Sequence, residues 1–245
     1  MQKKNHPILV LGGTSGIGKQ LAINLNNSGH DVFAVGRSEN KIESLQETHP
    51  ELKMLKADLT DTNDIDNLIE RIETPLKGLV YSAGSIHLKP IKYLDEEDFE
   101  QTISINLIAP FKLIKRLLQA KKIAKEASIV LISSITGVHR GLYGGIAYGT
   151  SKAGLVGMMK SMAVELSKRK IRVNTLSPGM IITEGTKDYL ASLGEETLRA
   201  DLNNYPLGKY GSTDDVSSLV HFLLGNESSW VTGQDFVIDG GRTLK

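Results

Sequence analysis

The sequence of residues 8–18 is Ile-Leu-Val-Leu-Gly-Gly-Thr-Ser-Gly-Ile-Gly, a short apolar run that passes directly into a cluster of glycines. The apolar run predicts a buried strand, and an amphipathic helical pattern over residues 16–28 follows. Glycines between a strand and a helix let a pyrophosphate approach the backbone, and the free N–H groups at the helix start attract its charge. An ordinary strand-to-helix turn is the alternative, but the position at the start of a βαβ pattern favours a nucleotide-binding turn.

The rest of the chain repeats this alternation. Short apolar runs alternate with longer amphipathic segments, which indicates a parallel sheet covered by helices on both faces. Strands are predicted at residues 8–11, 32–35, 52–57, 79–81, 129–132, 171–176 and 236–238, and helices near residues 16–28, 39–48, 63–73, 97–124, 149–168 and 213–225. No proline- or serine-rich linker and no fixed repeat interrupts the pattern, so we expect one doubly wound α/β domain over residues 1–245.

The composition limits the classes of function. Lysine and arginine total 29 and aspartate and glutamate 28, so the net charge of +1 gives no reason to expect nucleic acid or an anionic membrane as a partner. The chain has no cysteine, and its six histidines are scattered, which argues against a metal site. No apolar run approaches the ~20 residues of a membrane span or forms a signal-peptide core, so we expect a soluble, cytoplasmic protein.

A tyrosine and a lysine stand four residues apart in Tyr148-Gly-Thr-Ser-Lys152, where the helical pattern of residues 149–168 begins. On a helix this spacing places both side chains on one face, one turn apart. A free tyrosine titrates near pH ~10, and a neighbouring cation lowers that pKa by roughly one to three units, so the pair could exchange a proton with a carbonyl or an alcohol. The spacing recurs at residues 205–209, where a proline and a glycine oppose a helix. A surface tyrosine and lysine on an amphipathic helix is the alternative at residues 148–152.

The glycine spacing Gly-x-x-x-Gly-x-Gly and the Tyr-x-x-x-Lys pair together resemble the short-chain dehydrogenase/reductase family, over almost the whole chain. The resemblance implies that Tyr148 transfers a proton, and that Lys152 lowers the pKa of Tyr148 and holds the nicotinamide ribose. It also implies that Ser134, before Ile-Thr-Gly, binds the substrate oxygen, and that Asn106, in Ile-Asn-Leu, fixes a water that leads a proton from Lys152 to solvent. From sequence alone, Ser134 is equally well a turn cap, and Asn106 a residue that bonds to local backbone.

The resemblance further implies which residues surround the cofactor. Asp58 corresponds to the aspartate beside the adenine, and Pro178-Gly179 with Thr183 corresponds to the turn over the nicotinamide. The implied cofactor-binding residues are Gly12, Thr14, Ser15, Gly16, Ile17, Gly18, Arg37, Ser38, Asp58, Leu59, Ser82, Ala83, Gly84, Tyr148, Lys152, Pro178, Gly179, Ile181 and Thr183.

The end of the second predicted strand indicates which dinucleotide binds. The residue about 20 positions beyond the glycines meets the adenine ribose, where a carboxylate favours the 2′-hydroxyl of NAD. Here the strand ends in Gly36-Arg37-Ser38, with no carboxylate until Glu39. Arginine can bind a 2′-phosphate through two hydrogen bonds, so we expect NADP as the cofactor. A solvated Arg37 is the alternative.

Several features depart from the family or leave the substrate open. The family's Asn-Asn-Ala-Gly is Tyr81-Ser82-Ala83-Gly84 here, Leu11 replaces a threonine, and the stretch from Ser134 to Tyr148 is one residue longer than expected. His139 and Arg140, in that longer loop, could meet a polar or anionic substrate or simply be solvated. Residues 181–210 lack strand alternation and contain glycines and a proline, so we expect a lid over the substrate with some short helix.

Among family members, the chain resembles 3-ketoacyl-(acyl-carrier-protein) reductases, which implies reduction of a carbonyl by NADPH. Cations that end two predicted helices could dock an acidic carrier, although such cations are favourable without a partner; they are Lys121, Lys122, Lys125, Lys168 and Arg169. A sugar, steroid or secondary-alcohol dehydrogenase and a non-catalytic nucleotide sensor are the alternatives. Small residues on the helix after Tyr148, together with the resemblance, imply a homotetramer.

Overall fold

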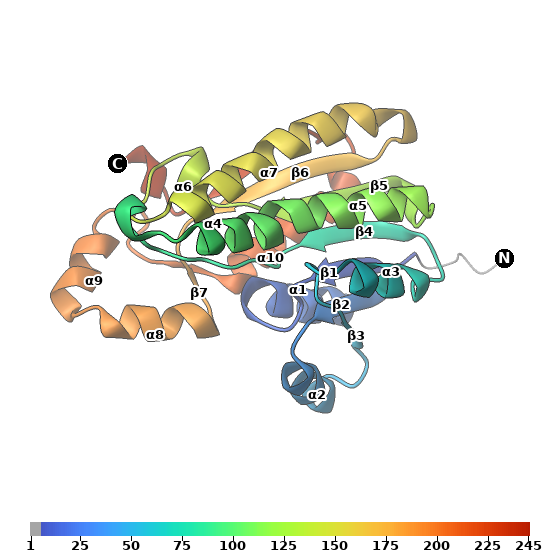
Figure 1. The fold of residues 1–245 in the computed structure, drawn as a ribbon, viewed down its shortest axis with the longest axis horizontal. Helices are drawn as coiled ribbons and strands as arrows, with labels where there is room; N and C mark the ends of the chain where they lie inside the picture. Colours follow the sequence, from blue (N-terminus) through green and yellow to red (C-terminus); the bar gives the residue numbers. More distant parts are fainter. Residues whose placement is uncertain (1–5) are drawn as a thin grey trace.

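The expected strands all form, and they pair in one parallel sheet with the order β3-β2-β1-β4-β5-β6-β9 (Figure 1). The computed structural model describes residues 6–245. The strands are β1 (Ile8–Leu11), β2 (Val32–Gly36), β3 (Lys53–Lys56), β4 (Leu76–Tyr81), β5 (Ile123–Ile132), β6 (Arg172–Pro178) and β9 (Asp235–Ile238). The order reverses between β1 and β4, so the prediction of a doubly wound sheet is confirmed.

Helices cover both faces of the sheet. They are α1 (Gly16–Asn27), α2 (Glu39–Thr48), α3 (Thr62–Glu70), α4 (Glu96–Ile103), α5 (Ala109–Gln119), α6 (Ile135–Val138), α7 (Ile146–Glu165), α8 (Glu184–Ser192), α9 (Glu195–Leu202) and α10 (Thr213–Leu224). Short 3-10 turns lie at Ile91–Tyr93, Ser167–Arg169, Asn226–Ser228 and Arg242–Leu244. Helices α3, α5 and α7 pack on one face and α1, α2 and α10 on the other (Figure 1). Within residues 6–245, no helix combines the length and apolar character needed to cross a membrane.

Burial on both faces explains why β1 is a continuous apolar run. Alternate side chains of a strand point to opposite faces. Leu9 and Leu11 belong to one core and Ile8 and Val10 to the other, and none is more than 1% exposed. A strand covered on both sides has no solvent-facing positions, so its sequence lacks polar alternation.

The predicted helix over residues 97–124 is wrong at its carboxyl end and interrupted in its middle. Helix α4 passes into a π turn, Ser104–Ile108, which is labelled η2, and continues as α5. The helix ends at Gln119, and β5 begins at Ile123 rather than at residue 129. Glu126 has φ 62°, a left-handed conformation that interrupts the early part of β5. A charged residue at such a break hides the start of the strand from a search for apolar runs.

Residues 181–210 contain two helices rather than a loop. Strand β7 (Ile181–Ile182) pairs with β8 (Gly211–Ser212), and α8 and α9 lie between them at one end of the molecule (Figure 1). Thr183 caps α8, because its Oγ1 accepts a hydrogen bond from the N–H of Thr186 at 3.2 Å. The expectation of some short helix in this segment is confirmed.

Candidate active site

The glycine cluster forms a tight turn at the carboxyl end of β1, where the strand order reverses. Gly12 has φ +78°, and a Cβ there would lie 2.7 Å from the backbone nitrogen of Ala83. A Cβ on Gly18 would lie 2.3 Å from the carbonyl oxygen of Gly12. Only glycine fits these two positions, so the turn can lie directly against the end of β4.

The start of α1 is open to an anion. Ser15 is the N-cap, yet within residues 6–245 its side chain makes no capping bond, and the first turn holds no acidic residue. The first N–H groups of the helix therefore lack a side-chain acceptor, and the helix dipole adds a partial positive charge. Thr14 lies beside this turn and packs on Gly36, where a Cβ would come within 2.3 Å of the Thr14 Cγ2. The arrangement suits a pyrophosphate.

The end of β2 and the loop after β3 form the next part of the site. The pKa of Asp58 lies below its ordinary value, chiefly because the hydroxyl and N–H of Thr60 donate to its Oδ1, at 2.6 and 2.9 Å; Arg37 adds a smaller effect. Arg37 is exposed, and Ser38 starts α2 without a side-chain capping bond among the described residues. Glu39, the first carboxylate after β2, is paired with Lys56 at 2.7 Å. This edge of the site therefore offers an exposed guanidinium and a hydroxyl.

Two apolar residues beside the candidate cofactor site, Leu59 and Ile17, pack into the cores of the domain. The Leu59 side chain is 5% exposed and lies in one core, and Ile17 packs against the other. Their side chains support the loops on either side of the candidate cofactor site.

Tyr148 and Lys152 lie one turn apart on α7, as their spacing predicts. The Lys152 Nζ lies 5.6 Å from the centre of the Tyr148 ring and donates a hydrogen bond to the carbonyl of Ile132 at 2.8 Å. The Ser133 hydroxyl donates to the Lys152 carbonyl at 2.9 Å, so the end of β5 fixes the lysine at both its backbone and its ammonium. Burial lowers the pKa of Lys152 to about 8.

Burial also acts on Tyr148, in the direction opposite to the effect that the sequence predicts for a neighbouring cation. It raises the pKa of the phenol, because a low-dielectric surrounding disfavours the phenolate, and a hydrogen bond with Ser134 offsets this only in part. Burial and the Ser134 hydroxyl are the causes of this pKa shift, and a lowering of it by Lys152 stays a prediction. The phenol is therefore protonated at neutral pH, which is the state of a proton donor.

Ser134 ends the run from β5 and is 8% exposed. Its Oγ accepts a hydrogen bond from the Thr136 N–H at 3.1 Å, so it caps α6, and its hydroxyl is near enough to Tyr148 to lower the pKa of that phenol. The turn-cap interpretation of this serine is confirmed, and its contact with the substrate oxygen stays a prediction. Gly137 has φ +88°, and a Cβ there would lie 2.1 Å from the carbonyl oxygen of Gly149, so this loop packs directly on the first turn of α7.

Asn106 is fully buried in the π turn. Its Nδ2 donates to the Ser85 carbonyl and to the Ser151 Oγ, both at 2.9 Å, and its Oδ1 accepts from the Ser85 N–H at 2.9 Å. The Ser151 hydroxyl donates in turn to the Tyr148 carbonyl at 2.7 Å. The Asn106 side chain thus bonds to the backbone of Ser85, which is distant in the chain rather than local, and it links the loop after β4 to α7. A water relay past it stays a prediction.

Sequence reasoning missed two members of this network, Ser85 and Ser151. The only signal was their position, one directly after Tyr-Ser-Ala-Gly and the other directly before Lys152. The Ser85 Oγ is buried and has no hydrogen-bond partner among residues 6–245. Gly84 lies beside them, since a Cβ there would come within 2.9 Å of the Asn106 Oδ1 and 3.6 Å of the Lys152 Nζ.

The turn after β6 reaches back to the glycine cluster. Pro178 ends β6, and the Gly179 N–H donates to the Ile238 carbonyl at 2.9 Å. A Cβ on Gly16 would lie 3.5 Å from the Thr183 Cγ2. The strand order brings this turn, Ser82 and Ala83 after β4, and the end of β1 to one edge of the sheet, where ligands of doubly wound folds bind.

His139 is exposed, as its solvated alternative expects, and it also makes one ion pair. Its Nε2 bonds to a carboxylate oxygen of Asp235 at 2.7 Å, and that carboxylate also accepts from the hydroxyls of Thr175 and Ser177. The longer loop after Ser134 is therefore tied to the edge of the sheet.

The basic residues considered for docking lie far from this site. Lys122 donates to the Ile72 carbonyl and Arg169 to the Ile123 carbonyl. Ile123 begins β5, whereas Ser134 follows its end, so a ten-residue strand separates them, roughly 30 Å. The prediction that these cations end two helices is wrong for Lys125, which lies in β5.

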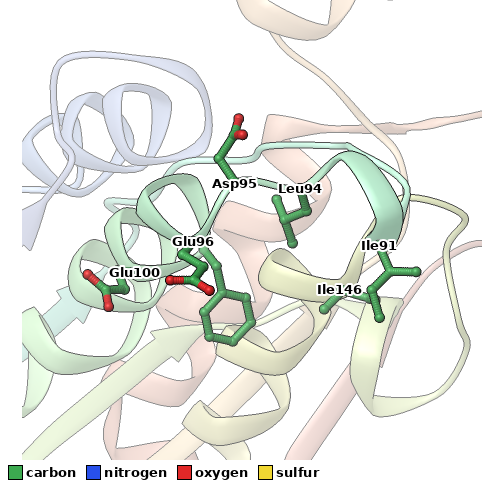
Figure 2. A pocket seen from close by; sticks show the side chains of 7 residues that line it. Ile91, Leu94, Asp95, Glu96, Glu100 and Ile146 are labelled. Carbon is green, nitrogen blue, oxygen red and sulfur yellow. The ribbon is translucent and has the colours of Figure 1, made fainter.

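Two hollows adjoin the start of α7. Figure 2 shows the first, of about 300 Å³, where Ile91, Leu94 and Ile146 lie near three carboxylates. Its lining residues are Ile91, Leu94, Asp95, Glu96, Phe99, Glu100 and Ile146. The second, of about 440 Å³, shares Ile146. Neither is lined by Ser134, Tyr148 or Lys152, although the second is lined by Gly149, the residue after Tyr148.

A doubly wound sheet with an open glycine turn, and a buried lysine one turn from a protonated tyrosine, defines a nicotinamide-dependent oxidoreductase as the class. Comparison with known proteins agrees. Residues 12–243 match the sequence model of the family described as enoyl-(acyl carrier protein) reductase. The 3-oxoacyl-[acyl-carrier-protein] reductase of Rickettsia bellii is 36% identical over 96% of each chain.

Solved structures show the same relationship. A 4-hydroxyisoleucine dehydrogenase mutant complexed with NADH and succinate superimposes with a TM-score of 0.87 at 31% identity, over 97% of this chain and 98% of that chain. A short-chain type dehydrogenase/reductase from Mycobacterium ulcerans gives 0.89 at 28% identity, over 100% and 92%. The chain belongs to the short-chain dehydrogenase/reductase family and is an oxidoreductase of that family.

Proposed function

We propose that this chain reduces a carbonyl group to a secondary alcohol with NADPH, and that Tyr148 is the proton donor. The observation that carries the proposal is the grouping of Tyr148, Ser134 and Lys152 at the end of β5 and the start of α7. When bound, the cofactor supplies the hydride that adds to the carbonyl carbon.

Each side chain has a separate task in this proposal. Tyr148, whose raised pKa keeps its proton, gives that proton to the carbonyl oxygen. The Ser134 hydroxyl donates a hydrogen bond to the same oxygen, where negative charge develops. The Lys152 ammonium holds the ribose hydroxyls of the nicotinamide nucleotide.

Proton supply involves the network around Asn106. We propose that a water bonded near Asn106 returns a proton from solvent to Lys152. The buried and unpartnered Ser85 hydroxyl, next to the Asn106 side chain within the described chain, supports a water at this place.

The cofactor assignment extends along the edge of the sheet. The glycine turn and the start of α1 would bind the pyrophosphate, and Asp58 and Leu59 would lie by the adenine. Arg37 and Ser38 would bind the 2′-phosphate, and the pairing of Glu39 with Lys56 supports this choice because it neutralises the first carboxylate after β2. Residues 82–84 and 178–183 would border the nicotinamide, with residues 181–210 as a lid. A relative is described with NADH, so Arg37 is the feature to test.

A 3-ketoacyl thioester is the substrate class that we propose first, since the Rickettsia relative is named for it. The basic residues lie far from Ser134. A carrier protein that docked on them would therefore not reach the active site of the same chain with its thioester. A secondary-alcohol dehydrogenase is the second candidate, favoured by the likeness to 4-hydroxyisoleucine dehydrogenase.

The experiment is a screen of NADPH oxidation with purified protein and Tyr148→Phe as a matched control. The substrates are acetoacetyl-coenzyme A, a ketosugar and a diketone. We expect turnover with one carbonyl class, fastest with the thioester, and its loss in the variant. Oxidation of NADPH that is equal in both proteins would contradict the proposal, and turnover with the ketosugar alone would redirect the substrate class.

We also propose a homotetramer with two kinds of contact. The outer faces of α5 and α7 carry exposed apolar residues, including Phe111 and Val164, and β9 is an edge strand of the sheet. Two separate self-complementary surfaces are what dihedral symmetry requires. Light scattering should give about four times the 26.7 kDa of one chain; a monomer mass at micromolar concentration would contradict this.

A further inference from the structure

We propose that Tyr81 is a positioning residue for the active site: its hydroxyl holds the π turn that presents Asn106 to the catalytic helix. This inference rests on the proposed function only for its kinetic readout. Tyr81 stands where the family has an asparagine, and it ends β4, outside the set of residues assigned to the cofactor or the substrate.

The argument begins with one backbone carbonyl, that of Ile105. In a regular α-helix, the N–H of Ala109 would donate to it, but this N–H donates to the Ser104 carbonyl instead. In the π pattern the donor would be residue 110, which is proline and has no N–H. Both helical donors for the Ile105 carbonyl are therefore lost, for two independent reasons.

Tyr81 supplies the missing donor. Its hydroxyl donates to the Ile105 carbonyl at 2.7 Å, and the side chain is 1% exposed. Ile105 packs against the same core, where a carbonyl without a donor is costly. A phenylalanine would fill the same space and leave the carbonyl unbonded. The hydroxyl thus stabilises the π turn against the α register, in which the Ala109 N–H would serve Ile105.

The register of this turn decides where Asn106 points. Inserting or removing one residue of a helical turn rotates the following side chains by about 100° around the axis. In the π register Asn106 bonds to both backbone groups of Ser85 and to the Ser151 hydroxyl, which bonds to Tyr148. Loss of the register would break these bonds together, although the Tyr81 hydroxyl donates to the Ile105 carbonyl and not to the groups that they join.

The test compares Tyr81→Phe, Asn106→Ala and the double variant, with Tyr93→Phe as the control because Tyr93 is exposed. With NADPH and the carbonyl substrate found in the screen, Tyr81→Phe should lower kcat about tenfold and leave the KM for NADPH within about twofold. If Tyr81 acts through Asn106, the double variant should be no slower than Asn106→Ala alone. The proposal would be overturned if the two substitutions lowered kcat by the product of their separate factors in the double variant. A wild-type kcat in Tyr81→Phe would also overturn it.

A second readout is independent of any activity. The Ser85 N–H donates to the Asn106 Oδ1, so its amide hydrogen exchange reports this contact directly. Exchange should quicken in Tyr81→Phe and in Asn106→Ala but not in Tyr93→Phe. If Tyr81→Phe does not fold, Tyr81→Asn, which installs the family's residue, removes the same hydroxyl. Wild-type Ser85 protection in the folded variant would overturn the proposal even if the chain reduced no carbonyl.

Discussion

The catalytic end and the adenine end of the site are built in different ways. Asn106, Ser134 and Lys152 are each less than one-tenth exposed, and hydrogen bonds tie them to the loop after β4, to the cap of α6 and to the end of β5. Arg37, by contrast, is exposed. Proton and hydride transfer need atoms held within a fraction of an ångström, whereas attraction between charges acts at longer range. We therefore expect the rate of catalysis to depend on the buried hydrogen-bond network, and the preference for one cofactor to depend on the exposed adenine end.

The strongest test of the catalytic end is Tyr148→Phe. Only the phenolic oxygen is deleted, and a positioned proton donor contributes about 10²- to 10⁴-fold to rate, so kcat should fall by that factor. Folding and cofactor binding should stay close to wild type, as circular dichroism and fluorescence titration with NADPH can check. A variant that kept most of its reductase activity would remove Tyr148 from its proposed role.

The matching test of the adenine end is Arg37→Ala. A charge-assisted hydrogen bond is worth roughly 1.5–3 kcal/mol and less when exposed, so wild type should prefer NADPH over NADH by roughly tenfold to a hundredfold in kcat/KM. The variant should lose most of this preference through weaker NADPH binding, and rising salt should shrink it in the wild type. Equal kcat/KM values in wild type, or an unchanged ratio in the variant, would refute the assignment.

The pH profile gives a smaller effect that separates Lys152 from Tyr148. Lys152 has a lowered pKa of about 8, so its ammonium loses its proton as pH rises through that value, while the phenol keeps its own. The kcat/KM for NADPH reports the free enzyme and should decline above pH about 8, by up to about tenfold per unit. Lys152→Arg should move this decline beyond pH ~10, because a guanidinium titrates above ~12. A wild-type profile that is flat to pH 10 would contradict the role of the ammonium.

Much of the fold could be predicted from sequence, because buried parallel strands leave a direct trace. Strand β1 begins and ends where its apolar run does, since both of its faces are covered. Strand β5 leaves a weaker trace: its first half includes Lys125 and Glu126, so only its last four residues were predicted. Ile123 at the start of the strand is buried, but the exposed pair Lys125 and Glu126 separates it from the apolar run, and a search for continuous apolar runs therefore misses it.

The positions of the site residues on their helices and strands could be predicted from sequence. The pKa values of those residues could not. The spacing of Tyr148 and Lys152 is a property of the helix, whereas the pKa of Tyr148 depends on what surrounds it, and burial raises that pKa. The π turn could not be foreseen either. Pro110 removes one donor, but the compensating hydroxyl of Tyr81 lies 24 positions before Ile105 in the chain. Such a pairing requires knowledge of the tertiary structure.

The central claim, that the two ends of the site act separately, is tested most directly by single-turnover kinetics. Wild type, Tyr148→Phe and Arg37→Ala are each titrated with NADPH, and then mixed at saturation with the carbonyl substrate while nicotinamide absorbance is followed. We predict that Tyr148→Phe slows the absorbance change about 10²- to 10⁴-fold with an unchanged Kd. Arg37→Ala should weaken binding roughly tenfold or more and leave the rate at saturation unchanged. A Tyr148→Phe protein with a wild-type rate, or an Arg37→Ala protein with a wild-type Kd and a slowed rate, would contradict the account.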